Sequence, residues 1–316
     1  MKIKSIKSLT INTEHIISFS IYTDTDSIFY PLEPLLIARY GKQNFTDEEF
    51  VEKGLPLIDE VQSFINKSYD TYAKAFHNVT EHGWNIKQEL VARRGFWSGK
   101  EVKLKKGEMP SDKSQSVEGV KKRYAQWIVN KKGVPKDYMD VKGLESVRSN
   151  FPAKFRLKLS EIYKGILHDI SEGDMNLLMR SFKKEILTLP ITDIMIPTSV
   201  NSVEDYDTGE FGSYEKGTPV HVKAALNYNS FLKLNNIEAP NLTDGDKILW
   251  CYLKDNPMQF QSIALSRESN PPEVVEFVES YIDKTSIFEK IFINKVQGYY
   301  SSIGWGKITL NVNNFF

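Results

Sequence analysis

The 316-residue sequence predicts an α+β protein, with antiparallel strands prominent in its first half and mainly helices in its second. Residues 14–30 and 86–131 are rich in β-branched and aromatic residues, with polar stretches between the apolar runs, which is typical of antiparallel hairpins. Beyond about residue 146, apolar residues recur at helical spacing in several stretches. The length allows one large domain or two ordinary ones.

Composition excludes several classes of protein. The net charge is formally zero, so a DNA-binding surface would have to come from local clustering of cations. The one cysteine, Cys251, excludes an internal disulfide framework, and its apolar neighbours predict a buried, inert thiol. The histidines are scattered without ligand spacing, which argues against a zinc site. No stretch has the apolar length of a membrane span, and no secretory signal is evident.

The first half begins with a predicted hairpin and a helix. Residues 14–30, EHIISFSIYTDTDSIFY, predict two short strands joined by a tight polar turn. Thr46 and Glu49 form a capping box, which predicts a helix from Thr46 to about His77. Pro56 is expected to break or kink this helix. The apolar residues at helical spacing within it are Phe50, Leu57, Val61, Phe64 and Ile65.

Two more strands are predicted at residues 86–98 and 121–131, paired antiparallel. The residues between them, 99–120, are rich in Lys, Ser and Gly and are expected to form an exposed loop. In the second half, Ser149 or Asn150 is expected to cap a helix that holds Pro152 in its early turn.

Further elements are predicted along the second half. A helix is expected from Asp174 to about Leu187, and strand-like runs follow at KILWCYL and FQSIAL. Pro271 and Pro272 are expected to open another helix. The last twelve residues, WGKITLNVNNFF, have no helical period and end in two aromatic residues.

The polar turn DTDS carries two carboxylates at positions i and i+2, Asp24 and Asp26. Nucleotidyl transfer needs two Mg²⁺ ions held by carboxylates on a rigid support, and a hairpin turn is a suitable support. The alternative is a structural turn, since Asp and Thr are common in hairpin turns. A DxD pair taken alone is more often structural than metal-binding.

A cluster of cations stands beside an aromatic residue on the strand that contains KKRYA. The four residues are Lys121, Lys122, Arg123 and Tyr124. Strand alternation predicts that Lys122 and Tyr124 share a face, where they could contact the minor groove and the sugar-phosphate backbone of DNA without sequence preference. The alternative is a solvated basic strand with Tyr124 packed on the core.

Several ordered motifs resemble those of family B DNA polymerases. The segment YTDTDS at 22–27 resembles motif C. GFW at 95–97 follows in the family's order, and after it KKRYA at 121–125 resembles the KxY element. DVKGLESVRSNFP at 140–152 resembles the crossing from palm to thumb. Residues 244–257 and 281–299 resemble the end of the thumb in polymerases of the T-even phage kind.

This resemblance implies a domain organisation and a set of roles. It implies an unmatched leader at 1–19, the C-terminal part of a palm at 20–145, a thumb at 146–307 and a clamp-binding tail at 308–316. Asp26 would be the principal ligand of two Mg²⁺ ions, with Asp24 supportive and with Tyr22, Thr25 and Ser27 supporting the motif. The residues that would bind primer-template DNA are Lys121, Lys122, Arg123 and Tyr124. The expected location is the cytoplasm of an infected bacterial host, without a membrane partner.

The departures from the family pattern are as informative as the matches. Nothing in the sequence resembles motif A, the fingers helix of motif B or the 3′–5′ exonuclease motifs. The resemblance therefore implies a split or truncated polymerase that needs an N-terminal polymerase chain and binds a dNTP only in the assembled enzyme. The alternative is a non-catalytic DNA- and clamp-binding remnant, which predicts that no partner chain exists.

The C-terminal segment ITLNVNNFF resembles the short clamp-binding tail of T-even-type polymerases. Leu310, Phe315 and Phe316 would be the residues that dock on the sliding clamp. The alternative is that these side chains fold back on the thumb, since exposed aromatic residues at a chain end are unfavourable without a pocket.

Overall fold

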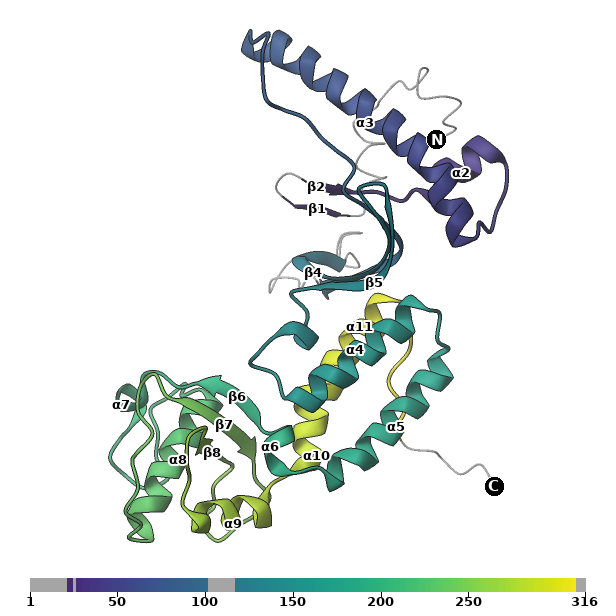
Figure 1. The fold of residues 1–316 in the computed structure, drawn as a ribbon. Coiled ribbons are helices and arrows are strands. Elements are labelled where there is room, and N and C mark those ends of the chain that lie inside the picture. The colour runs from purple at the N-terminus through teal and green to yellow at the C-terminus, as the bar shows by residue number, and fades with distance from the viewer. Residues whose placement is uncertain (1–21, 25–26, 102–116, 311–316) are drawn as a thin grey trace, which may run out of the picture. The chain divides into compact units, whose positions relative to one another are not determined.

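The computed structural model describes residues 22–24, 27–101 and 117–310 (Figure 1). The chain divides into two compact units, unit 1 at Met1–Lys142 and unit 2 at Gly143–Phe316. Both units combine helices with antiparallel sheets, which confirms the predicted α+β class.

A short hairpin opens the described part of unit 1. Strand β1 (Tyr22–Asp24) pairs antiparallel with β2 (Ser27–Phe29), and Asp24 faces Ser27 across the two-residue connection at 25–26. The predicted hairpin is confirmed by this antiparallel pairing.

Two helices follow the hairpin, α2 (Glu33–Tyr40) and α3 (Asp47–His77). The predicted capping box is present, because the Glu49 backbone N–H donates to Thr46 Oγ1 at 3.2 Å and the Thr46 N–H donates to Glu49 Oε2 at 3.1 Å. Helix α3 runs through Pro56 as one element, so the predicted break is wrong.

Packing around Pro56 explains why the helix continues. An interior proline costs about 3 kcal/mol, whereas each fully buried apolar side chain contributes roughly 1.5–3 kcal/mol. Phe50 and Leu57 are both buried on either side of the proline. Helix α2 also approaches closely, since a Cβ on Gly54 would lie 2.6 Å from Leu32 Cδ2. The small core cluster around these helices comprises Leu32, Leu36, Phe45, Phe50, Leu57, Val91 and Val129.

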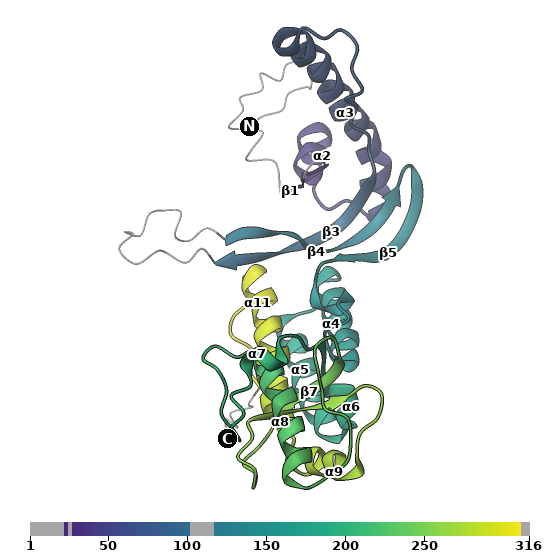
Figure 2. The ribbon, with the colours of Figure 1, turned by 90° about the vertical axis from the view of Figure 1, so that its left-hand side faces the viewer.

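A three-stranded antiparallel sheet completes unit 1, with strands β3 (Leu90–Glu101), β4 (Val117–Lys131) and β5 (Val134–Lys142) in that order (Figure 2). The pairing of β3 with β4 was predicted. The exposed loop predicted at 99–120 is shorter, because pairing continues to Glu101 and Val117. Strand β5 was not predicted. The sequence feature that could have predicted this strand is the pair Lys132 and Gly133. Their φ values of 52° and 82° suit a two-residue hairpin turn.

The helices of unit 2 pack around a cluster of phenylalanine rings. Helix α4 (Ala153–Leu167) and helix α5 (Glu172–Thr188) lie beside a C-terminal helical run made of α10 (Lys284–Ile287), the π-helix η4 (Phe288–Ile293) and α11 (Asn294–Ser302) (Figure 1). The rings of Phe155 and Phe182 lie 5.1 and 4.9 Å from that of Phe292, so one residue of the π-helix joins all three helical elements.

Helix α4 begins later than predicted. Its N-cap is Pro152, so the expected caps Ser149 and Asn150 are wrong. The physical reason is that a proline disfavours helical backbone in the residue before it, which stops a helix from starting upstream of Pro152. The helix predicted from Asp174 is confirmed as α5, with Ser171 as its cap.

A second antiparallel sheet forms the rest of unit 2. Strands β6 (Ile196–Ser199), β7 (Lys247–Tyr252) and β8 (Ser262–Ser266) lie in chain order, with α8 (Val220–Leu234) and α9 (Pro272–Tyr281) beside them. The predicted strands β7 and β8 and the predicted helix α9 are confirmed. Three short helices complete the unit: η3 (Glu145–Val147), α6 (Ile191–Ile194) and α7 (Val203–Tyr206). Cys251 is buried, and burial raises the pKa of its thiol, as expected for an inert residue.

A buried polar network joins the start of unit 2 to its last helix. The Glu145 side chain is only 3% exposed, and Tyr299 donates a hydrogen bond to its Oε2. The Tyr163 hydroxyl donates to that of Tyr299 at 2.9 Å, and Lys295 Nζ lies 3.6 Å from Glu145 Oε1. Desolvation, reinforced by Tyr163 and Glu145, raises the pKa of Tyr299 far above its usual value.

Candidate active site

The hairpin contains the first and the last residue of the predicted DTDS turn, Asp24 and Ser27. Asp24 is the last residue of β1 and Ser27 is the first residue of β2, so these two positions are brought together across the turn. Tyr22 pairs with Phe29 at the other end of the hairpin. Thr25 and Asp26 lie outside the described residues.

An aromatic cluster of Phe29, Trp97 and Tyr124 joins the hairpin to the sheet of unit 1. The ring of Phe29 lies 5.9 Å from that of Trp97 and 5.6 Å from that of Tyr124, and Trp97 and Tyr124 are 6.1 Å apart. These are favourable separations for tilted and edge-on ring pairs. The cluster therefore brings together three sequence motifs, the DTDS hairpin, GFW and KKRYA.

Gly95 belongs to the same arrangement. A Cβ at this position would lie 2.9 Å from Trp97 Cη2 and 3.4 Å from Gln126 Cβ. Any larger residue at 95 would therefore press on the Trp97 ring, which explains why GFW begins with glycine.

The basic strand differs from the prediction. Lys122 has a φ of 60°, and the β3–β4 register shifts between Trp97 and Gly99, so regular alternation ends here. Lys122 is exposed, whereas Arg123 and Tyr124 are partly buried. The positive φ and the register shift interrupt the regular alternation from which a common face for Lys122 and Tyr124 was predicted. The ring of Tyr124 packs against Trp97 and Phe29, as the alternative interpretation expected. Lys121 lies in the same part of β4.

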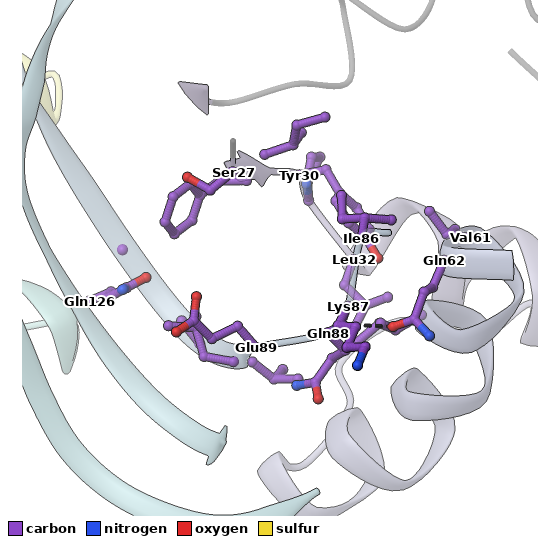
Figure 3. Close-up of a pocket in the computed structure, with 18 of the residues that line it drawn as sticks. Ser27, Tyr30, Leu32, Val61, Gln62, Ile86, Lys87, Gln88, Glu89 and Gln126 are labelled. Atoms are coloured by element: carbon purple, nitrogen blue, oxygen red, sulfur yellow. Dashed lines mark hydrogen bonds between the residues drawn. The ribbon is translucent and has the colours of Figure 1, made fainter. Parts of the chain in front are cut away.

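A pocket of about 430 Å³ lies between the hairpin, α3 and the sheet. Figure 3 shows Ser27 and Tyr30 on one side, Gln62 of α3 and Gln88 on another, and Gln126 of β4 opposite them. Burial, with a smaller effect of Asp59, raises the pKa of Tyr30 to about 12, so its hydroxyl keeps its proton. The sequence did not predict this pocket. The sequence feature that could have indicated it is Gln126, a polar residue inside the apolar run YAQWIV.

The chain is similar to the DNA-directed DNA polymerase of Enterobacteria phage T4. The two sequences are 23% identical over 292 residues, which cover 89% of this chain and 30% of that relative. The chain therefore spans about 30% of the length of the curated relative it matches. No protein-family model matches the sequence. The similarity supports a relationship between this chain and that polymerase.

The DTDS sequence of the hairpin contains two aspartates. Carboxylates at Asp24 and Asp26 are the hard oxygen ligands that Mg²⁺ prefers. Among the described residues, no group of three or more His, Cys, Asp or Glu side chains could hold a metal ion by itself. A magnesium site built on this hairpin therefore needs ligands beyond those that the structure describes.

The region of the predicted clamp-binding tail begins on the helices of unit 2. Ile308 is buried, and its N–H donates to Gln297 Oε1 at 2.9 Å. Arg180 Nε donates to the Thr309 carbonyl at 3.1 Å, and Leu310 is half-buried. Phe315 and Phe316 lie outside the described residues. No helix in the described ranges is long and apolar enough to cross a membrane.

Proposed function

We propose that this chain is the C-terminal part of a replicative family B DNA polymerase. In this proposal, residues 20–145 form part of the palm, residues 146–307 form the thumb, and residues 308–316 bind a sliding clamp. The observation that carries the proposal is the aromatic cluster, which places the DTDS hairpin against the two strands that carry GFW and KKRYA. The similarity to the polymerase of phage T4 also supports this proposal.

The proposed active site would use the two hairpin aspartates to hold two Mg²⁺ ions. When bound, these ions would stabilise the charge that develops on the transferred phosphoryl group. Asp26 is the principal ligand and Asp24 supports it. Phe29 holds the hairpin against Trp97 and Tyr124, so the carboxylates rest on a rigid support.

Chemistry would require segments that the 316 residues do not contain. The opposing metal ligand of motif A, the nucleotide-binding fingers and the exonuclease would come from the remaining polymerase polypeptide. This arrangement explains why the matched region is 30% of the relative while the hairpin motif is complete.

Reconstitution tests the proposed function. The purified chain, supplied with a primed template, dNTPs and Mg²⁺, is expected to show no primer extension. Addition of the remaining polymerase polypeptide, expressed separately, is expected to restore extension. Primer extension by the chain alone, or none in the mixture when both proteins are folded, would contradict the proposal.

Lys122 is expected to contribute to binding of primer-template DNA. Lys122→Ala should weaken affinity and lower the slope of log Kd against log salt concentration by about one, because one phosphate contact is lost. Fluorescence anisotropy over a salt series measures both quantities. Lys136→Ala is the matched control, since Lys136 is an exposed lysine on β5 of the same sheet. An equal effect of both substitutions would show that Lys122 contributes only general charge.

The end of the tail beyond residue 310, which contains Phe315 and Phe316, is expected to be required for clamp binding. Deletion of 311–316 should remove clamp-dependent processivity and leave the unfolding free energy of the chain unchanged. Deletion of 308–316 should also destabilise unit 2 by about 2–3 kcal/mol, because it removes buried Ile308 and two hydrogen bonds. Chemical denaturation and a primer-extension assay with the cognate clamp separate the two effects. Full processivity after deletion of 311–316 would place the clamp anchor elsewhere.

A further inference from the structure

Three buried polar atoms of the pocket in unit 1 have no hydrogen-bond partner among the described residues. They are Gln126 Oε1, Gln88 Nε2 and Trp97 Nε1, all from residues that line the pocket. Gln126 is only 1% exposed. Its Nε2 donates to Oδ2 of Asp140 on the neighbouring strand β5 at 3.5 Å, and its Oε1 is turned toward the pocket (Figure 3).

Unpaired buried polar atoms are unusual in a native protein, because each loses its hydrogen bond to water on folding. Two donors and one acceptor around the same pocket indicate an occupant that itself offers both acceptors and donors. A peptide backbone does so at every residue, through its C=O and N–H groups.

The walls of the pocket indicate the side chains of that occupant. Ile28, Val61 and Ile86 line it, and Ile28 is 46% exposed on the hairpin. The hairpin itself has three-residue strands, and a two-stranded hairpin is only marginally stable without further packing. An occupant with apolar side chains would cover Ile28 and support the hairpin.

The charges at the pocket argue against a nucleotide as the occupant. The cations of the lining are Lys87, Arg93 and Arg94, and the acidic residues are Glu33 and Glu89. Arg93 is already paired, with its Nε 2.5 Å from Asp47 Oδ1 and its Nη2 donating to the Phe45 carbonyl. No strong excess of positive charge is left to bind a triphosphate.

We propose that this pocket seats an extended segment of the remaining polymerase polypeptide, bound through its backbone and its apolar side chains. The inference rests on the proposed function, and the uncovered 70% of the relative's length (100% minus the 30% matched) provides the chain that could supply the segment. A backbone N–H of this segment donates to Gln126 Oε1, and its carbonyls accept from Gln88 Nε2 and Trp97 Nε1.

Substitution of Gln126 by leucine tests this assignment, because docking and intrinsic stability should respond differently. In the isolated chain, Gln126→Leu should leave stability unchanged or raise it, since an unpaired buried acceptor is removed. Association with the remaining polymerase polypeptide should weaken by about tenfold, the loss expected for one hydrogen bond at a buried site. Gln43→Leu is the control, because Gln43 is exposed in the same unit.

A second variant and a spectroscopic signal make the test independent of how Gln126→Leu folds. Ile28→Glu changes a half-exposed residue, so the chain should fold, but association should be lost. In the nuclear magnetic resonance spectrum, the signal of the Trp97 indole N–H is assigned by its absence from Trp97→Phe. This signal should shift when the remaining polymerase polypeptide, or one of a set of overlapping short peptides from it, is added.

The outcomes separate the inference from the proposed function. If primer extension is restored but neither Gln126→Leu nor Ile28→Glu weakens association, the pocket assignment is wrong and the polymerase function stands. If both variants weaken association but the complex extends no primer, the pocket assignment stands and the function is wrong. A shift of the Trp97 signal by dNTP but not by polypeptide would overturn the assignment in favour of a nucleotide site.

Discussion

Replacement of Asp26 by alanine is expected to abolish nucleotidyl transfer by the assembled polymerase while leaving its affinity for primer-template DNA nearly unchanged. Loss of the principal magnesium ligand removes several kcal/mol of stabilisation of the transition state, which corresponds to a rate reduction of about 10³-fold or more. Single-turnover primer extension measures the rate, and anisotropy with the same duplex measures binding.

The companion substitution Asp24→Ala provides the comparison within the same turn. Asp24 ends β1 and pairs with Ser27, so it belongs to the same hairpin but is assigned the supporting role. Its loss should reduce the rate less than the loss of Asp26. Near-normal turnover in Asp26→Ala, or a larger defect in Asp24→Ala, would refute the assignment of the principal ligand.

Replacement of Tyr299 by phenylalanine is expected to destabilise unit 2 by about 2–3 kcal/mol. The substitution removes one hydroxyl that donates to Glu145 and accepts from Tyr163, so both buried groups lose a partner. Chemical denaturation should show the loss as a lower midpoint. Tyr281→Phe is the matched control, because the ring of Tyr281 packs on Phe277 in the same unit. Among the described residues, the Tyr281 hydroxyl makes no hydrogen bond. Equal effects of the two substitutions would contradict the role of the network.

The same network predicts how stability depends on alkaline pH. Burial raises the pKa of Tyr299 and Tyr300 in the folded protein above the usual value of 10.0. The contribution of these two protonated hydroxyls to the free energy of unfolding is complete below about pH 10. It is lost as the pH rises further, because the unfolded chain then releases protons that the folded chain retains. Tyr299→Phe should therefore show a smaller loss of stability above pH 10 than the wild-type chain.

Local signals account for the parts of the fold that the sequence predicted. The Thr46–Glu49 capping box and the pairing of Asp24 with Ser27 act between residues close in the chain, and both are present. The break expected at Pro56 fails because tertiary burial of Phe50 and Leu57 outweighs the local preference. The regular alternation expected at Lys122 and Tyr124 is interrupted by a register shift, which depends on how β3 and β4 pair.

The candidate site shows the same division between local and long-range information. The sequence identified the motifs around Asp24, Trp97 and Tyr124, but it could not reveal that their segments meet through Phe29, since ring packing depends on the folded arrangement. The pocket was missed for the same reason. Gln126 stands in an apolar run, and only the structure shows that its oxygen faces a space bounded by the hairpin and α3.

The bond between Tyr299 and Glu145 has a consequence for synthesis of the protein on the ribosome. Its partners are 154 residues apart in the chain. At about 5–20 residues per second, translation of that interval takes roughly 8–30 s. Once α4 and α5 have been synthesised within this interval, Phe155 and Phe182 are left without one of the rings that bury them until Phe292 is added. The nascent chain should therefore be most open to chaperones and proteases in this interval, which ends only when the final helix is released.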